Sequence, residues 1–180
     1  MMTDLEKAAQ TQIINQLNKE GYPSYAKLFV LFDLNLTDDP NVIGYMIPNK
    51  AKITINQNLD IEQVSVIVRH EILHEYLSHQ LRMEKKFGKD VWDKRTNRMH
   101  YDSNVAGDYE ISNLGYTDKD KSIARHIMLN GKVIHGLVTE DDHPDWVDKS
   151  FEEMYDLLEK QKEQEKQDMK LSPDLEDLLD

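Results

Sequence analysis

The stretch that decides how this chain is interpreted is His70-Glu71-Ile72-Leu73-His74. It lies in a segment whose apolar residues recur at helical spacing from residue 61 toward residue 81. Residues four positions apart in a helix are turned by about 400°, so the imidazoles of His70 and His74 share one face and can bind one metal ion. The spacing therefore predicts a metal site on a helix, whereas the alternative is an exposed helix with scattered histidines.

Glu71 gives this motif its catalytic interpretation. It is turned by about 100° from His70, which can set its carboxylate beside a water molecule on the metal. Zinc lowers the pKa of such a water, and a carboxylate can take the proton as a general base. The motif thus favours a peptidase acting on a peptide or protein substrate. Several residues could supply a donor for the oxyanion, and the sequence does not rank them: Tyr101, Tyr109, Tyr116, Arg125 and His126.

A catalytic zinc site usually has three protein ligands. The chain has no cysteine, so the third must be His, Asp or Glu. The best candidate is Asp108, on a second helix predicted over residues 95–114; His100, Asn104 and Asp108 share one face of it. Gly107 would let this helix approach another closely. We expect His100 or Asn104 to orient a ligand or to line the cleft.

The remaining histidines are weaker candidates for the third ligand. In an unbroken helix, His79 would point about 140° away from the second motif histidine, so we expect it to be a surface or helix-end residue. His126, His135 and His143 belong to no local ligand pattern. The alternative for Asp108 itself is a surface ion pair.

The rest of the pattern predicts one domain that mixes helices and strands. An Asn130-Gly131 pair predicts a tight turn. Apolar spacing and turn residues predict helices at 3–20 and 151–158, and strands at 25–36, 43–47 and 52–56.

The end of the chain is acidic and has no apolar stripe beyond about residue 160. We expect residues 1–158 to form the domain. Residues 159–180 should be a partly disordered tail or a solvated helix that is dispensable for the fold.

Charge and hydropathy limit the partners. The net charge of −12 argues against nucleic-acid binding, because phosphate contacts need Lys and Arg. No apolar run approaches the ~20 residues of a membrane span, and the N-terminus lacks the apolar core of a signal peptide. We therefore expect a cytoplasmic protein without a membrane partner. The lack of cysteine excludes disulfides and thiol nucleophiles.

Two further stretches accompany the motif: Asn104-Val105-Ala106-Gly107-Asp108-Tyr109-Glu110-Ile111-Ser112-Asn113 and Ser150-Phe151-Glu152-Glu153-Met154-Tyr155-Asp156-Leu157-Leu158. Over roughly residues 5–158 the chain resembles the metallopeptidase-type domain that in many bacteria precedes a von Willebrand factor A-like domain and that occurs alone in phages and prophages. The first stretch departs from the Asn-x-Ala-x-Asp-x-x-Ile-Asn pattern of that family, because Ser112 precedes the final Asn.

The resemblance implies an α+β, zincin-like fold with a small mixed β-sheet, a motif helix and a second helix that bears a ligand. It implies Zn²⁺ held by His70, His74 and Asp108, with Glu71 as the catalytic base. In such folds an edge strand pairs with an extended substrate, so one predicted strand should lie open above the metal. Two alternatives stay open: a non-catalytic, zinc-stabilised interaction or inhibitor protein of phage or prophage origin, and an acidic mimic of nucleic acid.

Overall fold

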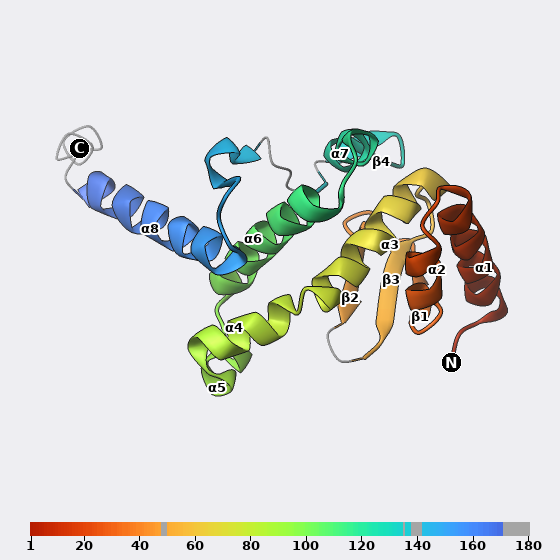
Figure 1. Ribbon diagram of the computed structural model, residues 1–180, viewed down its shortest axis with the longest axis horizontal. Coiled ribbons are helices and arrows are strands. Elements are labelled where there is room, and N and C mark those ends of the chain that lie inside the picture. Colours follow the sequence, from red (N-terminus) through yellow and green to blue (C-terminus); the bar gives the residue numbers. More distant parts are fainter. Residues whose placement is uncertain (48–49, 135, 138–141, 171–180) are drawn as a thin grey trace, which may run out of the picture.

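The structure is a computed structural model that describes residues 1–47, 50–134, 136, 137 and 142–170. It combines helices with two small sheets, so the expected α+β class is confirmed (Figure 1). Its elements are α1 (Asp4–Lys19), α2 (Pro23–Phe29), β1 (Asp33–Thr37), β2 (Gly44–Ile47), β3 (Lys52–Asn56), α3 (Ile61–Tyr76), α4 (His79–Phe87), α5 (Lys89–Asp93), α6 (Asn97–Gly115), α7 (Asp118–Arg125), β4 (Ile127–Leu129), β5 (Lys132–Ile134), the 3-10 helix η2 (Pro144–Trp146) and α8 (Phe151–Lys170).

The larger sheet is mixed. Its order is β1-β3-β2, with β3 parallel to β1 and antiparallel to β2. β2 and β3 lie where the sequence predicts strands. Because β2 pairs on one side only among the described residues, it leaves a backbone edge that can accept another strand.

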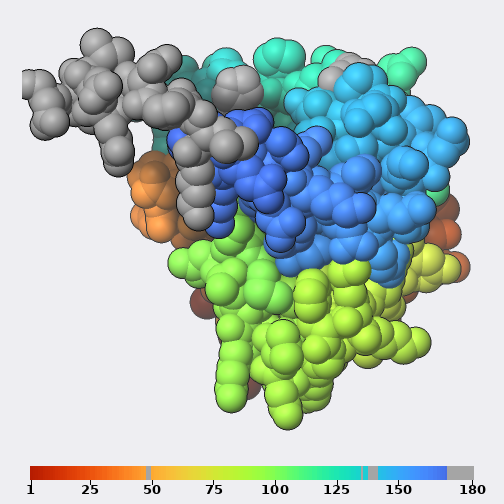
Figure 2. Space-filling view, turned by 90° about the vertical axis from the view of Figure 1, so that its left-hand side faces the viewer, coloured from red at the N-terminus to blue at the C-terminus, as the bar shows by residue number. Residues whose placement is uncertain are grey.

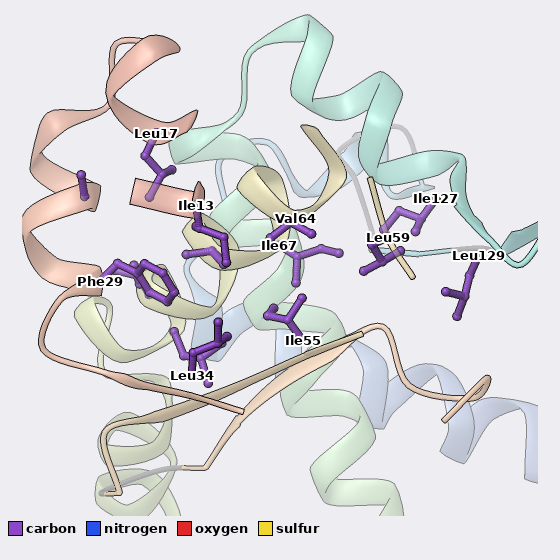
Figure 3. Close-up of a cluster of buried hydrophobic side chains, with 14 residues drawn as sticks. Ile13, Leu17, Phe29, Leu34, Ile55, Leu59, Val64, Ile67, Ile127 and Leu129 are labelled. Carbon is purple, nitrogen blue, oxygen red and sulfur yellow. The ribbon is translucent and has the colours of Figure 1, made fainter. Parts of the chain in front are cut away.

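Helix α3 lies between two groups of elements (Figure 1). On one side it packs against α1, α2 and the larger sheet. Figure 3 shows the apolar cluster formed there, in which Leu17, Phe29 and Leu34 are almost fully buried beside Ile67 of α3. This burial fixes one face of α3 on the sheet, because apolar area removed from water stabilises by about 25 cal/mol per Å².

A second apolar cluster lies on the other side and joins α8 to α4, α5 and α6. It is built from large side chains, including Trp92, Tyr109, Phe151 and Tyr155. In Figure 2 the surface of this part is formed by α8 in blue and the region of α4 and α5 in green below it. The packing of α8 against α6 therefore supports the second helix of the predicted site.

The strand predicted at 25–36 is wrong over its first half. Residues Pro23–Phe29 form α2, and only the end of the range is strand β1. Pro23 suits the first turn of a helix, and Ala26 and Phe29, three residues apart, are both buried. A short apolar run cannot be assigned to helix or strand by its periodicity alone.

The helix expected to continue from residue 61 toward 81 is interrupted. α3 ends at Tyr76, Ser78 adopts a left-handed conformation with φ 56°, and α4 begins at His79. No side-chain hydrogen bond caps this start of α4. The break changes the direction of the chain, so the helical rotation predicted for His79 does not apply.

The Asn130-Gly131 turn is confirmed, since it joins antiparallel β4 and β5 with φ 52° and 75°. Helix α8 crosses the boundary expected after residue 158, and residues 163–169 are exposed; residues 171–180 lie outside the described residues. No helix in the described ranges is both long and apolar enough to span a membrane.

Candidate metal centre

Three side chains from two helices converge on one point. The Nε2 atoms of His70 and His74, both on α3, lie 2.9 Å apart. Oδ1 of Asp108, on α6, lies 3.0 Å from the first and 3.1 Å from the second. The three residues are a group that could hold a metal ion. The structure thus brings together the three predicted ligands, and Glu71 lines the same cleft.

The donor set fits zinc. Zinc takes imidazole nitrogen and carboxylate oxygen at about 2.0–2.2 Å, so donors on one tetrahedral ion lie ~3–3.5 Å apart. The separations here are 2.9–3.1 Å. The same donors also suit other transition metals, so the identity of the ion is a separate question from the position of the site.

Gly107 allows α6 to approach α3 this closely. A Cβ atom at this position would lie 2.9 Å from Nδ1 of His79 and 3.0 Å from Cε1 of His74. Contacts under 3.0 Å are sterically forbidden for a real Cβ, and both neighbours are ring atoms with little freedom to move. The close approach predicted from Gly107 is therefore present, and it brings the neighbouring Asp108 to the two histidines.

His79 lies at the site, contrary to the prediction of a surface residue. Its side chain is buried, and its Nδ1 lies 2.8 Å from Nδ1 of His74. Its Nε2 lies 3.1 Å from Oε1 of Glu110. The break at Ser78 explains the difference, because α4 starts at His79 in a new direction. His79 thus supports a predicted ligand and does not compete with Asp108.

Hydrogen bonds link Glu110, the partner of His79, to helix α8 through Arg82. The guanidinium of Arg82 donates to both carboxylate oxygens of Glu110 and to Glu152 at the start of α8. Burial raises the pKa of Glu110, but its hydrogen bonds with His79 and Arg82 outweigh burial and lower the pKa overall. Glu110 therefore stays ionised and can accept a hydrogen bond from Nε2 of His79.

His70 has a partner of its own. The hydroxyl of Tyr116 lies 2.8 Å from Nδ1 of His70, so this nitrogen can donate to it while Nε2 faces Asp108. Burial raises the pKa of Tyr116 well above its ordinary value, and the charge of Asp108 adds to the effect. The phenol is therefore neutral. Tyr116 was one candidate oxyanion donor, but it does not line the cleft, and its hydroxyl contacts His70.

The Asp108 carboxylate is ionised. Burial acts to raise its pKa, but the charge and hydrogen bonds of His70 and His74 outweigh burial and hold the pKa well below its usual range. For His74, burial acts to lower the pKa, and the bond to Asp108 reverses this and raises it. An ionised carboxylate beside two imidazoles is the protonation state that a divalent cation needs from this residue.

A cleft of about 310 Å³ opens over the three donors. The edge strand β2 lines it through Gly44, Tyr45 and Met46, and α6 also lines it. Glu71 faces this space, and no described residue hydrogen-bonds its carboxylate. His100 and Asn104 both line the cleft, as expected of at least one of them, with 3.4 Å between Asn104 Nδ2 and His100 Nε2.

The other predicted candidates lie elsewhere. Tyr109 is buried in the second apolar cluster. His143 stacks on Trp146. Tyr101, Arg125 and His126 do not line the cleft, and His135 lies outside the described residues. The cleft wall also contains Trp92 and Arg95, which belong to no local ligand pattern in the sequence.

Comparison of the chain with protein-family models, with curated proteins and with solved structures gives no match. The site is therefore interpreted from its own residues and their geometry.

Proposed function

We propose that this chain is a zinc-dependent peptidase with a zincin-like arrangement of α3, α6 and the mixed sheet. His70, His74 and Asp108 would hold the zinc ion, and Glu71 would act as general base. The observation that carries the proposal is that three converging donors lie in an open cleft, beside a carboxylate with no hydrogen-bond partner among the described residues.

Zinc bound by these residues would supply a Lewis acid that makes a water molecule easier to deprotonate. Glu71 accepts the proton of the attacking water and returns it to the amine that leaves. His79 and Tyr116 hold the two histidine rings in orientation. Edge strand β2 lines the cleft and offers its unpaired backbone to an extended peptide.

The deciding experiment compares the wild-type protein with Glu71→Gln on a broad peptide library, with zinc content measured in both. Gln is close to Glu in size but cannot accept the proton, so we expect zinc and fold to be kept and turnover to fall by about 10²- to 10⁴-fold. Glu75→Gln is the matched control, because Glu75 lies one turn further along the same helix and lines the same cleft.

Equal cleavage by the wild-type protein and Glu71→Gln would contradict the proposal. Cleavage of no library peptide by zinc-loaded protein would favour the alternative, a zinc-stabilised interaction or inhibitor protein. Metal analysis of protein purified without added zinc identifies the ion. Stoichiometric zinc in a His70→Ala, His74→Ala double variant would disprove the ligand assignment.

A further inference from the structure

Arg95 is the only arginine or lysine among the described residues that line the metal cleft. Three carboxylates line the same space, those of Glu71, Glu75 and Asp108. The negative charges lie on the motif helix and at the metal donors, whereas Arg95 precedes the start of α6. The cleft therefore has a cationic end, although the chain as a whole carries a charge of −12.

The guanidinium of Arg95 is held in place but has no carboxylate partner within the part of the chain that the structure describes. It lies over the ring of Trp92 at 4.8 Å, and its Nη1 donates to the Trp92 carbonyl at 3.0 Å. Its Nε is 3.4 Å from Nδ1 of His100. Trp92 is itself buried and donates to Gln80, so it offers a fixed platform.

Other arginines of the chain are paired differently. Arg69, Arg82 and Arg98 each have a carboxylate within salt-bridge distance. For Arg95 no such carboxylate occurs among the described residues, and Nη2 forms no hydrogen bond there. A preordered guanidinium with free N–H groups suits a carboxylate ligand, because Arg binds carboxylates in a planar, charge-assisted geometry.

The helix sets the distance from Arg95 to the candidate metal donors. His100 contacts Arg95 and lies eight residues before Asp108 on α6, which corresponds to about 12 Å along the helix axis. An extended peptide advances by ~3.3 Å per residue. A peptide cleaved at the metal would therefore reach Arg95 with the third or fourth residue from the cleaved bond.

We propose that Arg95, on its Trp92 platform, binds a carboxylate of the substrate three or four residues from the cleaved bond. This inference rests on the proposed peptidase function. The carboxylate is either an acidic side chain or the free C-terminus of the peptide. Zinc at the three donors would offset the charges of Glu71 and Asp108, whereas Glu75 opposes an anion on the motif helix; Arg95 is the only arginine or lysine in the described lining of the cleft.

The experiment separates binding from turnover. An N-acetylated random octapeptide library, made as free acids and as C-terminal amides, is applied to zinc-loaded Glu71→Gln protein, and bound peptides are identified by mass spectrometry. We expect enrichment of peptides with a carboxylate. Adding Arg95→Gln to this protein should weaken the binding of those peptides by about 10- to 100-fold and abolish the enrichment. Enrichment among amides identifies an acidic side chain, and enrichment of free acids alone identifies the C-terminus.

Lys94→Gln is the matched control, because it removes one positive charge from the neighbouring residue, which is exposed and does not line the cleft. Melting temperature and zinc content should be the same in all three proteins. Equal binding by the Arg95→Gln and Lys94→Gln proteins, or no preference for carboxylates, would overturn the inference. If the wild-type protein cleaves nothing but carboxylate binding still depends on Arg95, the peptidase function is contradicted and the carboxylate site at Arg95 is not.

Discussion

The Nδ1 atoms of His74 and His79 lie 2.8 Å apart, so one ring must donate and the other accept. If Nε2 of His74 binds a metal, its Nδ1 carries the proton and donates a hydrogen bond to Nδ1 of His79. His79 can then donate from Nε2 to Glu110. Burial lowers the pKa of His79 below its ordinary value, which keeps the ring neutral and able to accept. Metal binding at His74 would thus fix which ring donates and which accepts in each of these contacts.

Replacing His79 should weaken zinc binding. His79→Ala removes the acceptor that fixes the proton on His74, and loss of such a supporting contact typically costs 10- to 100-fold in metal affinity. His79→Gln should recover part of the loss, because an amide can accept from His74 and donate to Glu110. The measurement is zinc affinity by competition with a chelator.

The control for this prediction is His126→Ala. His126 is exposed and does not line the cleft, so this change should leave zinc affinity unaltered. Zinc affinity in His79→Ala that equals that of the control would show that His79 only packs against its stacked neighbour Phe151.

Gly107→Ala should damage the site more than the fold. The added methyl group would lie 2.9 Å from the His79 ring and 3.0 Å from the His74 ring, so α6 must move away with Asp108. We expect at least a tenfold loss of zinc affinity, the lower end of the cost of altering a ligand's support. Gly115→Ala, on the same helix, would meet only a methyl group of Leu73 and should keep its zinc. Equal affinity in the two variants would contradict this account.

Much of the candidate site follows from local patterns. The spacing of His70 and His74 needs only a helix, and that helix is present. Asp108 was predicted from a helix face, and Gly107 from the space that its missing side chain leaves. The shared face of His70 and His74 follows from geometry within one helix, where four residues make nearly one turn. The position of Asp108 beside them depends in addition on the packing of α6 against α3.

The residues that the sequence could not place depend on breaks and on distant contacts. Ser78 adopts a left-handed conformation without a glycine to indicate it, so nothing local predicted the redirection of His79. Arg95 lies over Trp92 in a cleft that is also lined by β2, a combination that no local pattern predicts. The first half of 25–36 became a helix because its apolar residues fit either periodicity. In each case the outcome was decided by tertiary packing.

The buried pair of Arg69 and Asp120 should make stability depend on pH. Their side chains are almost fully buried and their charged atoms lie 2.8 Å apart. Burial raises the pKa of Asp120, but the hydrogen bonds with Arg69 outweigh it and lower the pKa. The stabilisation is therefore fully present above the unfolded-state pKa of about 3.9 and is lost as pH falls through the lower folded-state value.

Asp120→Asn should therefore cost about 3–5 kcal/mol at pH 7, because it leaves the Arg69 charge buried without its partner. The difference from the wild-type protein should shrink at pH 3 and below, which denaturant unfolding at several pH values would measure. Asp118→Asn is the control, since Asp118 lies in the first turn of the same helix and is exposed. A difference that does not change with pH would contradict the assigned direction of the pKa shift.

The last prediction concerns the acidic C-terminal segment, which the sequence suggested was dispensable beyond about residue 160. Lys162, on α8, forms an ion pair with Asp102, a carboxylate with no exposed surface. The other cation near Asp102 is Arg98, which is largely exposed and whose Nε lies 3.5 Å from Oδ1 of Asp102. Truncation after Lys160 removes Lys162 and leaves a buried charge, which should cost about 3 kcal/mol.

Two truncations and one rescue test this expectation. A chain that ends at Glu165 keeps Lys162 and loses the exposed residues 166–169 together with the residues that follow them, so it should melt within a few degrees of the full chain. A chain that ends at Lys160 should melt roughly 6–12 °C lower, as should full-length Lys162→Ala. Lys166→Ala, one turn further along α8, should have no effect, because Lys166 is exposed.

Adding Asp102→Asn to Lys162→Ala should restore part of the stability, since it removes the unpaired charge. If the chain that ends at Lys160 melts with the full chain, the pair contributes nothing and the whole segment beyond Lys160 is dispensable.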